Sequence, residues 1–329
     1  MPLQVYVSII VSPDSTRQKG REDVEKRRLG RTDMEVSVLG FGGSEIGFQG
    51  VTQPEVTRLL EGALDAGLNV IDTASAYQTS EEMIGAAVGH RRKDFYLLTK
   101  CGPTDGFARA DWSKAGILKQ IEQSLKRLRA DYVDLIQLHS CGRDVLRKGE
   151  AIEALQTARA NGQARYIGYS GDGQDALFAV ETGAFDTLQT SISIADQEAI
   201  DLTLPVARER GMGVIAKRPI ANAVWRNQTK PSDSYYHAYW ERLRKLDYDF
   251  LRGDPDQSIG IALRFTLSQP GVHTAIVGTT KPGRWSENAK LLEAEPLSDD
   301  EVEKIRARWR EVAGAMWRKL PGVNWKGQT

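Results

Sequence analysis

Short apolar runs alternate with longer amphipathic stretches along the chain, beginning near residue 26. The segment KRRLGRTDMEVSVLGFGG has the pattern of a hairpin that leads into a first buried strand, with Gly30 and Asp33 near the bends. The next helix begins at a capping box formed by Thr52 and Glu55, with a proline in its first turn. A later helix begins at the N-cap candidate Ser113. This alternation is typical of a parallel sheet covered by helices.

Seven further segments have the composition of buried strands. These are VIDT (70–73), FYLLTK (95–100), DLIQLH (134–139), ARYIGYS (164–170), TLQTSIS (187–193), GVIAKR (213–218) and TAIVGTT (274–280). Further helices are predicted over 80–88, 149–161, 174–182, 203–210 and 257–268. Eight strands are the number that closes a (β/α)8 barrel, so the predicted fold class is α/β, a TIM barrel with an N-terminal β-hairpin and with loops on its C-terminal face. A doubly wound open sheet is the alternative, but no G-x-G-x-x-G turn follows an early strand.

The first residues do not fit this pattern. The run MPLQVYVSIIVS is too short to cross a bilayer and lacks the basic start of a signal peptide. We therefore expect residues 1–25 to be a poorly ordered extension and residues 26–329 to form the barrel. A chain of 329 residues is long enough for two domains, but a single α/β barrel also reaches this size.

Charge and cysteine content narrow the class of protein. Lys+Arg 44 and Asp+Glu 44 balance to zero, which argues against binding to nucleic acid or another polyanion. The two cysteines, Cys101 and Cys141, provide neither a disulfide framework nor a zinc site made of four thiols. Strand alternation predicts that their side chains point in different directions and stay unpaired. We expect a cytoplasmic protein without a membrane partner.

Polar residues lie at or just after the ends of the predicted strands. They are Asp72, Lys100, His139, Ser170, Gln189, Arg218 and Thr280. In an α/β barrel the carboxyl ends of the strands meet at one rim, where active sites lie. The sequence therefore predicts a polar site at this rim.

Four of the side chains have the chemistry of proton transfer to a carbonyl oxygen. A lysine such as Lys100 lowers the pKa of a nearby phenol such as Tyr77, and Asp72 keeps the lysine charged. A neutral His139 orients a substrate oxygen by a hydrogen bond. Taken singly, each has another interpretation: a turn aspartate, a packed tyrosine, the Schiff-base lysine of an aldolase, or a core histidine.

The segments that carry these residues resemble the aldo-keto reductase family. GLNVIDTASAY with SEEMIG resembles the family signature in which aspartate and tyrosine stand five residues apart. LLTKCG contains the strand-end lysine, and SLKRLRADYVDLIQLHS resembles the second signature, which ends in the histidine. IGYSG and TKPGRWSEN resemble the family's nicotinamide and C-terminal cofactor segments. The resemblance runs from about residue 27 to residue 297.

This resemblance implies an oxidoreductase that reduces aldehydes or ketones with NADPH, without a metal or flavin. Tyr77 is then the general acid, tuned by Lys100 and Asp72, and His139 orients the carbonyl. Relatives with glutamate at the position of His139 reduce carbon–carbon double bonds, so the histidine favours carbonyl reduction. The residues expected to bind the cofactor are Ser170, Gln189, Arg218, Gly278, Thr279, Lys281, Arg284, Glu287 and Asn288.

Three features depart from the family pattern or leave its function open. Gly171 stands where asparagine is usual, and Lys217 and Arg218 stand where an aromatic or small polar pair is usual. Arg218 either stacks on the nicotinamide or binds pyrophosphate. The aromatic stretch 224–256 either lines a substrate pocket or packs onto the barrel. A cofactor-binding regulatory subunit on the same fold, as in relatives that accompany membrane channels, and an aldolase that uses Lys100 are the alternative functions.

Overall fold

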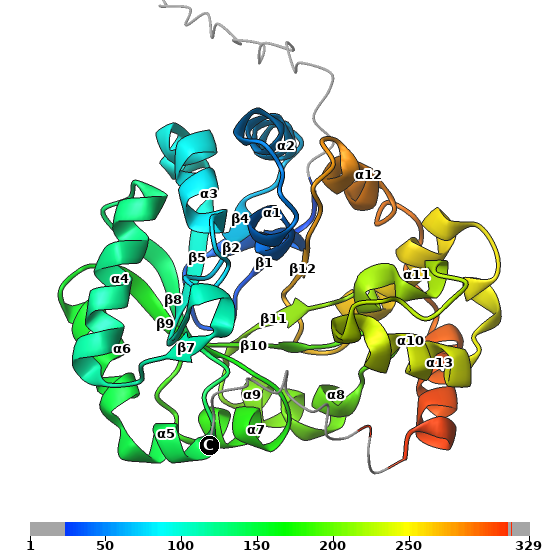
Figure 1. Cartoon of the computed structure of the whole chain (residues 1–329). Coiled ribbons are helices and arrows are strands. Elements are labelled where there is room, and N and C mark those ends of the chain that lie inside the picture. The colour runs from blue at the N-terminus through cyan, green and yellow to red at the C-terminus, as the bar shows by residue number, and fades with distance from the viewer. Residues whose placement is uncertain (1–23, 315–316, 318–329) are drawn as a thin grey trace, which may run out of the picture.

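Eight parallel strands form a closed barrel in the computed structural model, which describes residues 24–314 and Trp317 (Figure 1). The strands are β3 (Leu39–Gly42), β4 (Val70–Asp72), β5 (Tyr96–Cys101), β8 (Val133–His139), β9 (Ala164–Ser170), β10 (Thr187–Ser191), β11 (Gly213–Lys217) and β12 (Thr274–Val277). They follow one another around the barrel in chain order, and β12 pairs with β3 to close it. The predicted TIM barrel is confirmed.

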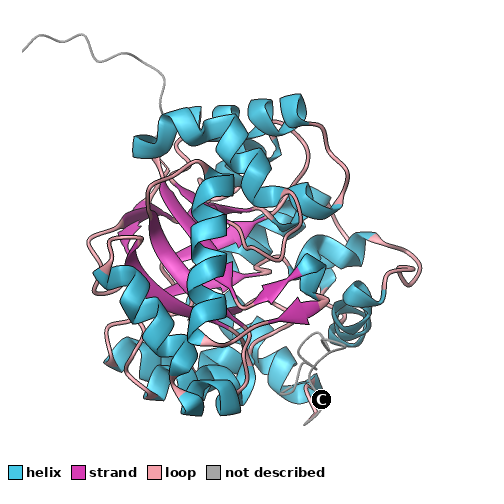
Figure 2. Cartoon of the chain, turned by 60° about the vertical axis from the view of Figure 1, so that its left-hand side comes forward, coloured by secondary structure: helices cyan, strands magenta, loops and turns pink. Residues whose placement is uncertain are grey.

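Helices surround this barrel (Figure 2). They are α1 (Ser44–Phe48), α2 (Gln53–Asp65), α3 (Ser80–Val88), α4 (Lys114–Leu128), α5 (Arg143–Lys148), α6 (Glu150–Ala160), α7 (Gly173–Glu181), α8 (Glu198–Leu202), α9 (Leu204–Glu209), α10 (His237–Leu246), α11 (Pro255–Ser268), α12 (Arg284–Lys290) and α13 (Asp299–Val312). The predicted capping box is present at Thr52 and Glu55, and Ser113 caps α4 by accepting from the Gly116 N–H. Apolar helix faces pack against the outward side chains of the strands in one continuous core.

A hairpin closes the N-terminal end of the barrel. Its strands are β1 (Lys26–Arg28) and β2 (Glu35–Ser37), which pair antiparallel as predicted. Leu29, Met34 and Val36 of the hairpin pack against the inward apolar side chains of the strands. Gly30 has φ +55°, and a Cβ atom there would lie 2.2 Å from the Gly213 nitrogen, so the turn needs glycine. The hairpin therefore acts as a plug.

The ends of the chain are described only in part. Residues 1–23, within the predicted extension, lie outside the described residues, as do 315–316 and 318–329. Val24 and Glu25, also placed in the extension, contact the barrel: Val24 packs on its core and the Glu25 carbonyl accepts from the Val38 N–H. Within the described residues, no helix is both long and apolar enough to cross a membrane.

Several elements were not predicted from the sequence. The loop 101–112 contains a two-stranded ribbon, β6 (Pro103–Thr104) and β7 (Arg109–Ala110), around the 3-10 turn η2 (Asp105–Phe107). Other 3-10 turns are η1 (Gly89–Asp94), η3 (Ala221–Arg226), η4 (Ser234–Tyr236) and η5 (Asp249–Leu251). α10, α11 and α13 lie together on one side of the barrel over a second apolar core (Figure 1). The capping box Ser298–Glu301 at the start of α13 is a sequence signal that we overlooked.

The directions of the two cysteine side chains differ from the prediction. Both thiols are free, as predicted, but their side chains do not point in different directions. Cys101 and Cys141 lie in the same outer core, because Ser140 has φ 63° and breaks the strand alternation after His139. Burial raises the pKa of both thiols, and the charges of Cys141 and Glu81 add to this effect at Cys101. They are structural, unreactive side chains.

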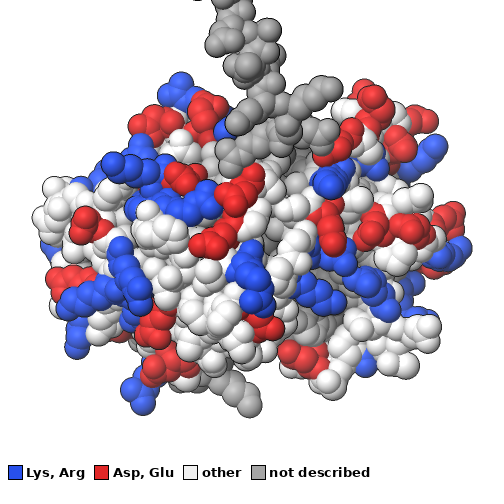
Figure 3. All heavy atoms as spheres, turned by 90° about the horizontal axis from the view of Figure 1, so that it is seen from above, with Lys and Arg blue, Asp and Glu red and all other residues white. Residues whose placement is uncertain are grey.

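Charges of both signs share the surface. On the face that Figure 3 shows, Lys and Arg side chains lie among Asp and Glu side chains. This mixture agrees with the balanced charge of the sequence.

Candidate active site

The four predicted catalytic side chains gather at the C-terminal rim of the barrel. Asp72 ends β4, Lys100 lies near the end of β5, His139 ends β8, and Tyr77 lies in the turn between β4 and α3. Lys100 Nζ is 2.5 Å from Asp72 Oδ2 and 5.0 Å from the centroid of the Tyr77 ring. The Tyr77 and His139 rings are edge-to-face, with centroids 5.5 Å apart. Three strands and one turn thus bring the Tyr77 hydroxyl, the Lys100–Asp72 ion pair and the His139 imidazole together.

A buried hydrogen-bond network fixes the carboxylate of Asp72. Its Oδ1 accepts from Gln189 Nε2 at 3.0 Å and from Gln137 Nε2 at 3.3 Å, and Gln189 Oε1 accepts from Ser170 Oγ at 3.0 Å. We missed Gln137 in the sequence. The signal was present, because Gln137 is a polar residue between the apolar Ile136 and Leu138 and lies two positions before His139, on the same face of the strand.

Lys100 is fully buried and its ammonium donates to Asp72 and to the Thr73 carbonyl, 2.8 Å away. Burial lowers the pKa of Lys100, and the charge of Asp72 opposes this effect. The ion pair holds the amine as a cation in a fixed position.

The surroundings of His139 favour its neutral form. It is 7% exposed, and burial lowers the pKa of its imidazole well below the usual range. The charges of Lys100, Lys217 and Arg218 lower it further. Its Nδ1 has no hydrogen-bond partner among the described residues. The neutral ring is therefore able to act as a donor toward a ligand oxygen.

The pKa of Tyr77 differs from the expectation based on sequence. Burial raises this pKa well above 10, and the charge of Asp72 adds to the effect. Burial outweighs the predicted lowering by Lys100, whose ammonium is already paired with Asp72. Arg218 is the group that opposes the rise. Tyr77 consequently holds its proton at neutral pH, as an acid must before it donates.

Aromatic rings flank Tyr77 and His139. The Phe107 ring lies 5.9 Å from that of Tyr77 and 5.1 Å from that of His139, and Phe48 lies 6.1 Å from Tyr77. Asp105 and Phe107 both have positive φ, at 51° and 77°, which L-residues rarely adopt. The 3-10 turn η2 thus holds Phe107 over the site in a strained conformation.

The segment after β12 contains most of the predicted cofactor residues. Arg284 begins α12 and is half-buried, with its guanidinium 3.4 Å from Asp256 and 3.1 Å from Glu287. Lys281 is exposed and its backbone N–H donates to Thr279. Asn288 is buried and, within the described part of the chain, its Oδ1 has no partner.

This segment fits a nucleotide. A buried acceptor without a donor costs free energy unless a ligand supplies the donor, and the amino group of an adenine is such a donor. Gly278 follows β12, and a Cβ atom there would meet the carboxylate of Glu45, so the missing side chain is what lets Glu45 approach this backbone. Arg284 and Lys281 are the cations available to a phosphate here.

The departures from the family pattern have local physical explanations. A Cβ atom on Gly171 would lie 2.5 Å from the Tyr169 ring, whose hydroxyl donates to the Cys141 carbonyl at 2.7 Å. Lys217 pairs with Asp172 at 3.0 Å. Arg218 has φ 56° and donates to the Tyr235 hydroxyl at 3.1 Å, with its guanidinium over that ring.

The aromatic stretch 224–256 mostly packs onto the barrel. Tyr239 and Tyr248 are buried in the second core, where Trp309 also lies. Tyr235 is exposed and lies with Arg218 at the rim. Most of its rings pack this insertion onto the barrel, and Tyr235 lies at the rim beside Arg218.

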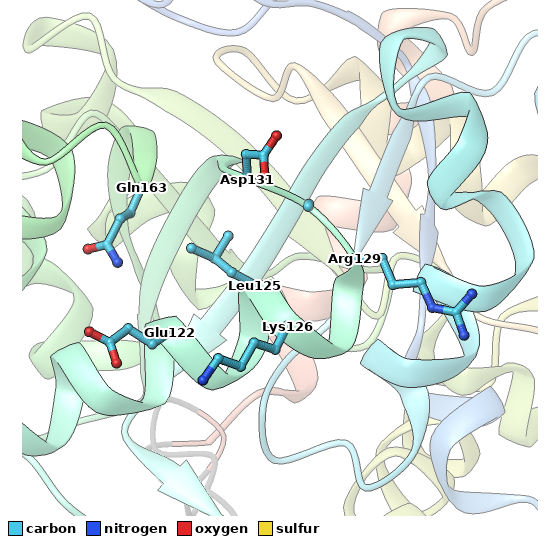
Figure 4. A pocket seen from close by; sticks show the side chains of 7 residues that line it. Glu122, Leu125, Lys126, Arg129, Asp131 and Gln163 are labelled. Carbon is cyan, nitrogen blue, oxygen red and sulfur yellow. The ribbon is translucent and has the colours of Figure 1, made fainter.

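A hollow on the outer surface has no relation to this chemistry (Figure 4). Its lining comes from the C-terminal half of α4 and the loops after it: Glu122, Leu125, Lys126, Arg129, Ala130, Asp131 and Gln163. None of the side chains discussed above reaches it. The rim remains the candidate active site.

Most of the chain is similar to proteins of one known family. Residues 38–310 match the model of the aldo/keto reductase family. L-Galactose dehydrogenase of Arabidopsis thaliana is 30% identical over 84% of this chain and 91% of its own length. A probable voltage-gated potassium channel subunit beta of Oryza sativa is 27% identical over 86% of this chain and 96% of its own.

The solved structures agree. The holo form of an aldo-keto reductase from Bacillus halodurans superposes with a TM-score of 0.77 at 28% identity, covering 90% of this chain and all of the other. The fold, the rim and the matched length therefore lead to one conclusion: the chain is a member of the aldo/keto reductase family.

Proposed function

We propose that this oxidoreductase reduces aldehydes or ketones to alcohols, with NADPH as the hydride donor. The observation that carries the proposal is the convergence of Asp72, Tyr77, Lys100 and His139 at the strand ends, with Tyr77 protonated and His139 neutral. When bound, NADPH supplies the hydride, which is chemistry that no side chain provides.

The side chains divide the remaining work. The Tyr77 hydroxyl donates its proton to the carbonyl oxygen as the carbon is reduced, and His139 donates a hydrogen bond that orients the same oxygen. Lys100, held by Asp72, places a positive charge beneath the tyrosine ring and stabilises the phenolate that remains. The fixed ion pair means that little reorganisation accompanies proton transfer.

Two groups of residues would hold the cofactor. Ser170 and Gln189 are already joined at 3.0 Å and would bind the nicotinamide carboxamide, and Arg218 lies beside them at the rim. The adenosine end would lie on the segment after β12. The residues of this segment that would contact it are Gly278, Thr279, Lys281, Arg284, Glu287 and Asn288.

A regulatory or interaction subunit with slow turnover is the second candidate. The similarity to a probable potassium channel subunit beta is the observation that favours it. All four catalytic side chains are present and arranged for proton transfer, which favours an enzyme. An aldolase is disfavoured because Lys100 is locked in an ion pair, whereas imine formation needs a free neutral amine.

Turnover of a panel of small aldehydes, followed by NADPH and NADH consumption, tests the proposal. The panel should include aldoses, because L-galactose dehydrogenase and D-threo-aldose 1-dehydrogenase are among the relatives. We expect reduction with NADPH to exceed that with NADH. Cofactor binding without turnover of any member would favour the regulatory candidate, and an imine on Lys100 trapped by borohydride would favour the aldolase.

A further inference from the structure

The ribbon of residues 102–111 lies over the two side chains that would contact the carbonyl oxygen. Its strands β6 and β7 pair antiparallel, and the turn η2 forms its tip. At this tip, the centroid of the Phe107 ring is 5.9 Å from that of Tyr77 and 5.1 Å from that of His139. The surroundings of both side chains therefore depend on the position of the ribbon.

Gln120 of α4 binds the base of the ribbon through three hydrogen bonds. Its Oε1 accepts from the Gly102 N–H at 2.8 Å, and its Nε2 donates to the Gly102 carbonyl at 3.2 Å. The same Nε2 donates to the Asp111 carbonyl at 3.3 Å. The Asp111 N–H in turn donates to the Gly102 carbonyl at 3.1 Å. One side chain thus joins the first and the last residue of the ribbon.

A glutamine at this position of α4 is costly unless its amide is bonded. Gln120 is 6% exposed and lies on the buried face of the helix with Ile117 and Ile121. An apolar side chain would suit this face, because a buried amide loses its hydrogen bonds to water. The amide instead bonds to the ribbon. Gln120 therefore holds the ribbon at a cost to the packing of α4.

The backbone of the ribbon is strained and needs contacts that fix it. Gly102 has φ +113°, and Asp105 and Phe107 have φ 51° and 77°. L-residues rarely adopt positive φ, so the tip would relax toward other conformations if its contacts were lost. At the tip, the Phe107 and Phe48 rings are nearly parallel, with centroids 6.4 Å apart. At the base, Gln120 supplies the fixing bonds.

The ribbon also contacts the turn that carries the proton donor. Ser75 Oγ donates to the Pro103 carbonyl at 3.1 Å, and the Ser75 N–H donates to the Lys100 carbonyl at 3.0 Å. If the base of the ribbon moved, Phe107 would leave Tyr77 and water would reach the phenol. Water weakens the electrostatic interactions on which proton transfer depends.

We propose that Gln120 is a positioning residue, which fixes the base of the ribbon so that Phe107 covers Tyr77 and His139. It acts on the reaction through the ribbon, since its bonds go to Gly102 and Asp111. The inference rests on the proposed carbonyl reduction, but the hold of Gln120 on the ribbon is measurable without turnover.

Gln120→Met removes the three bonds and keeps the length and helix propensity of the side chain. We expect it to lower kcat/KM for propanal by about five- to thirtyfold, as for the loss of one or two neutral hydrogen bonds. The Kd for NADPH, measured by fluorescence quenching, should stay within about twofold of wild type. Gln123→Met, at an exposed glutamine on the same helix, is the matched control and should change neither.

Phe107→Ala separates positioning from a general structural role. If Gln120 acts through the Phe107 ring, adding Gln120→Met to Phe107→Ala should lower kcat/KM further by less than about twofold. A loss as large in the Phe107→Ala protein as in wild type would mean that Gln120 acts by another route, and would overturn the inference.

Limited digestion with trypsin tests the hold on the ribbon without turnover. Arg109 lies exposed on β7, and cleavage after it requires the ribbon to open. By mass spectrometry, we expect Gln120→Met to be cut after Arg109 at least fivefold faster than wild type. Cleavage after Arg226, an exposed residue of η3, should not change.

This digestion also keeps the inference separate from the proposed reaction. If wild type reduces no aldehyde, the proposed reaction fails, and the cleavage rates then decide the role of Gln120. Equal rates after Arg109, or faster cleavage after both arginines, would overturn the inference. Gln120→Asn, whose amide is withdrawn by one methylene, takes the place of Gln120→Met if that variant does not fold.

Discussion

The two ends of the barrel treat their polar groups in opposite ways. At the N-terminal end, Asp134 is 2% exposed and accepts from Arg92 and Arg165 at 2.7 Å each and from the Leu97 N–H at 2.8 Å. Asp186 is likewise shared between Arg31 and Arg159. Every charge in these two groups has a partner, although Arg92 Nε and Thr187 Oγ1 at this end are buried without a hydrogen-bond partner among the described residues. The hairpin seals this end.

At the C-terminal rim several buried polar atoms lack hydrogen-bond partners among the described residues. Among them are His139 Nδ1, Gln137 Oε1 and Asn288 Oδ1. Ser140 and Arg218 have positive φ. Such features cost stability and persist where a ligand completes them. One end of the barrel therefore provides stability, and the other retains the unsatisfied groups that function requires.

The strongest test of this contrast is removal of the proton donor from the rim. Tyr77→Phe should lower kcat by about 10²–10⁴, the scale of general acid catalysis, while NADPH affinity changes little. Because the ring remains, the free energy of unfolding should change by less than about 1 kcal/mol. Steady-state kinetics measure kcat, and urea denaturation measures the free energy of unfolding. Turnover near that of wild type would refute the mechanism.

The converse change at the closed end should affect stability alone. Asp134→Ala leaves two arginines and the Leu97 N–H without their acceptor. Since both arginines are partly exposed, we expect a loss of about 2–3 kcal/mol in the free energy of unfolding, less than for a fully buried pair. At 15 °C, kcat/KM should stay within about twofold. Glu122→Ala, an exposed position on α4, is the control for denaturation experiments.

A smaller effect is expected from the cations of the cofactor segment. Arg284→Ala should weaken NADPH by about tenfold and leave NADH unchanged, because the 2′-phosphate needs a cationic partner. This loss of NADPH affinity lies at the low end for a charge-assisted contact, because Arg284 is already shared between Asp256 and Glu287. Dissociation constants of both cofactors measure it.

Lys281→Ala is the companion variant for this measurement. If Arg284→Ala keeps the full preference for NADPH over NADH and Lys281→Ala loses it, the exposed lysine binds the 2′-phosphate. Equal affinity of wild type for NADH and NADPH would show that neither cation selects the cofactor.

The smallest effect is a pH dependence that the rim imposes on stability. The pKa of His139 is lowered in the folded protein, so below about pH 6.5 the unfolded chain binds more protons than the folded one. Stability from this group is complete above that pH and is lost as the pH falls, by up to about 1.4 kcal/mol per pH unit. His139→Gln should show a shallower fall between pH 7 and pH 5.5.

Wild type and His139→Gln must be compared with each other, because Asp196 changes the stability of both with pH in the direction opposite to His139. The pKa of Asp196 is raised to about 7 by burial, so its contribution to stability falls as the pH rises from about 4 to 7. This contribution is common to wild type and variant and cancels in the difference. Parallel pH curves for the two proteins would contradict a neutral, buried His139.

The sequence by itself determined the barrel. Apolar runs at strand length, separated by capped amphipathic helices, led to the strand order, and the strand-end positions placed Asp72, Lys100 and His139 on one rim. These are local signals, because strand alternation and helix capping act over a few residues. The family signatures around Tyr77 and Lys281 are equally local.

Only the tertiary structure decided the electrostatics and the directions of several side chains. The pKa of Tyr77 rises because burial outweighs a lysine that Asp72 already occupies, and burial cannot be read from spacing. Cys141 turns outward because Ser140 adopts a positive φ. Glu45 gave no sequence signal at all. Its position depends on a close approach between α1 and the Tyr77 turn, which are distant along the chain and meet only when the barrel closes.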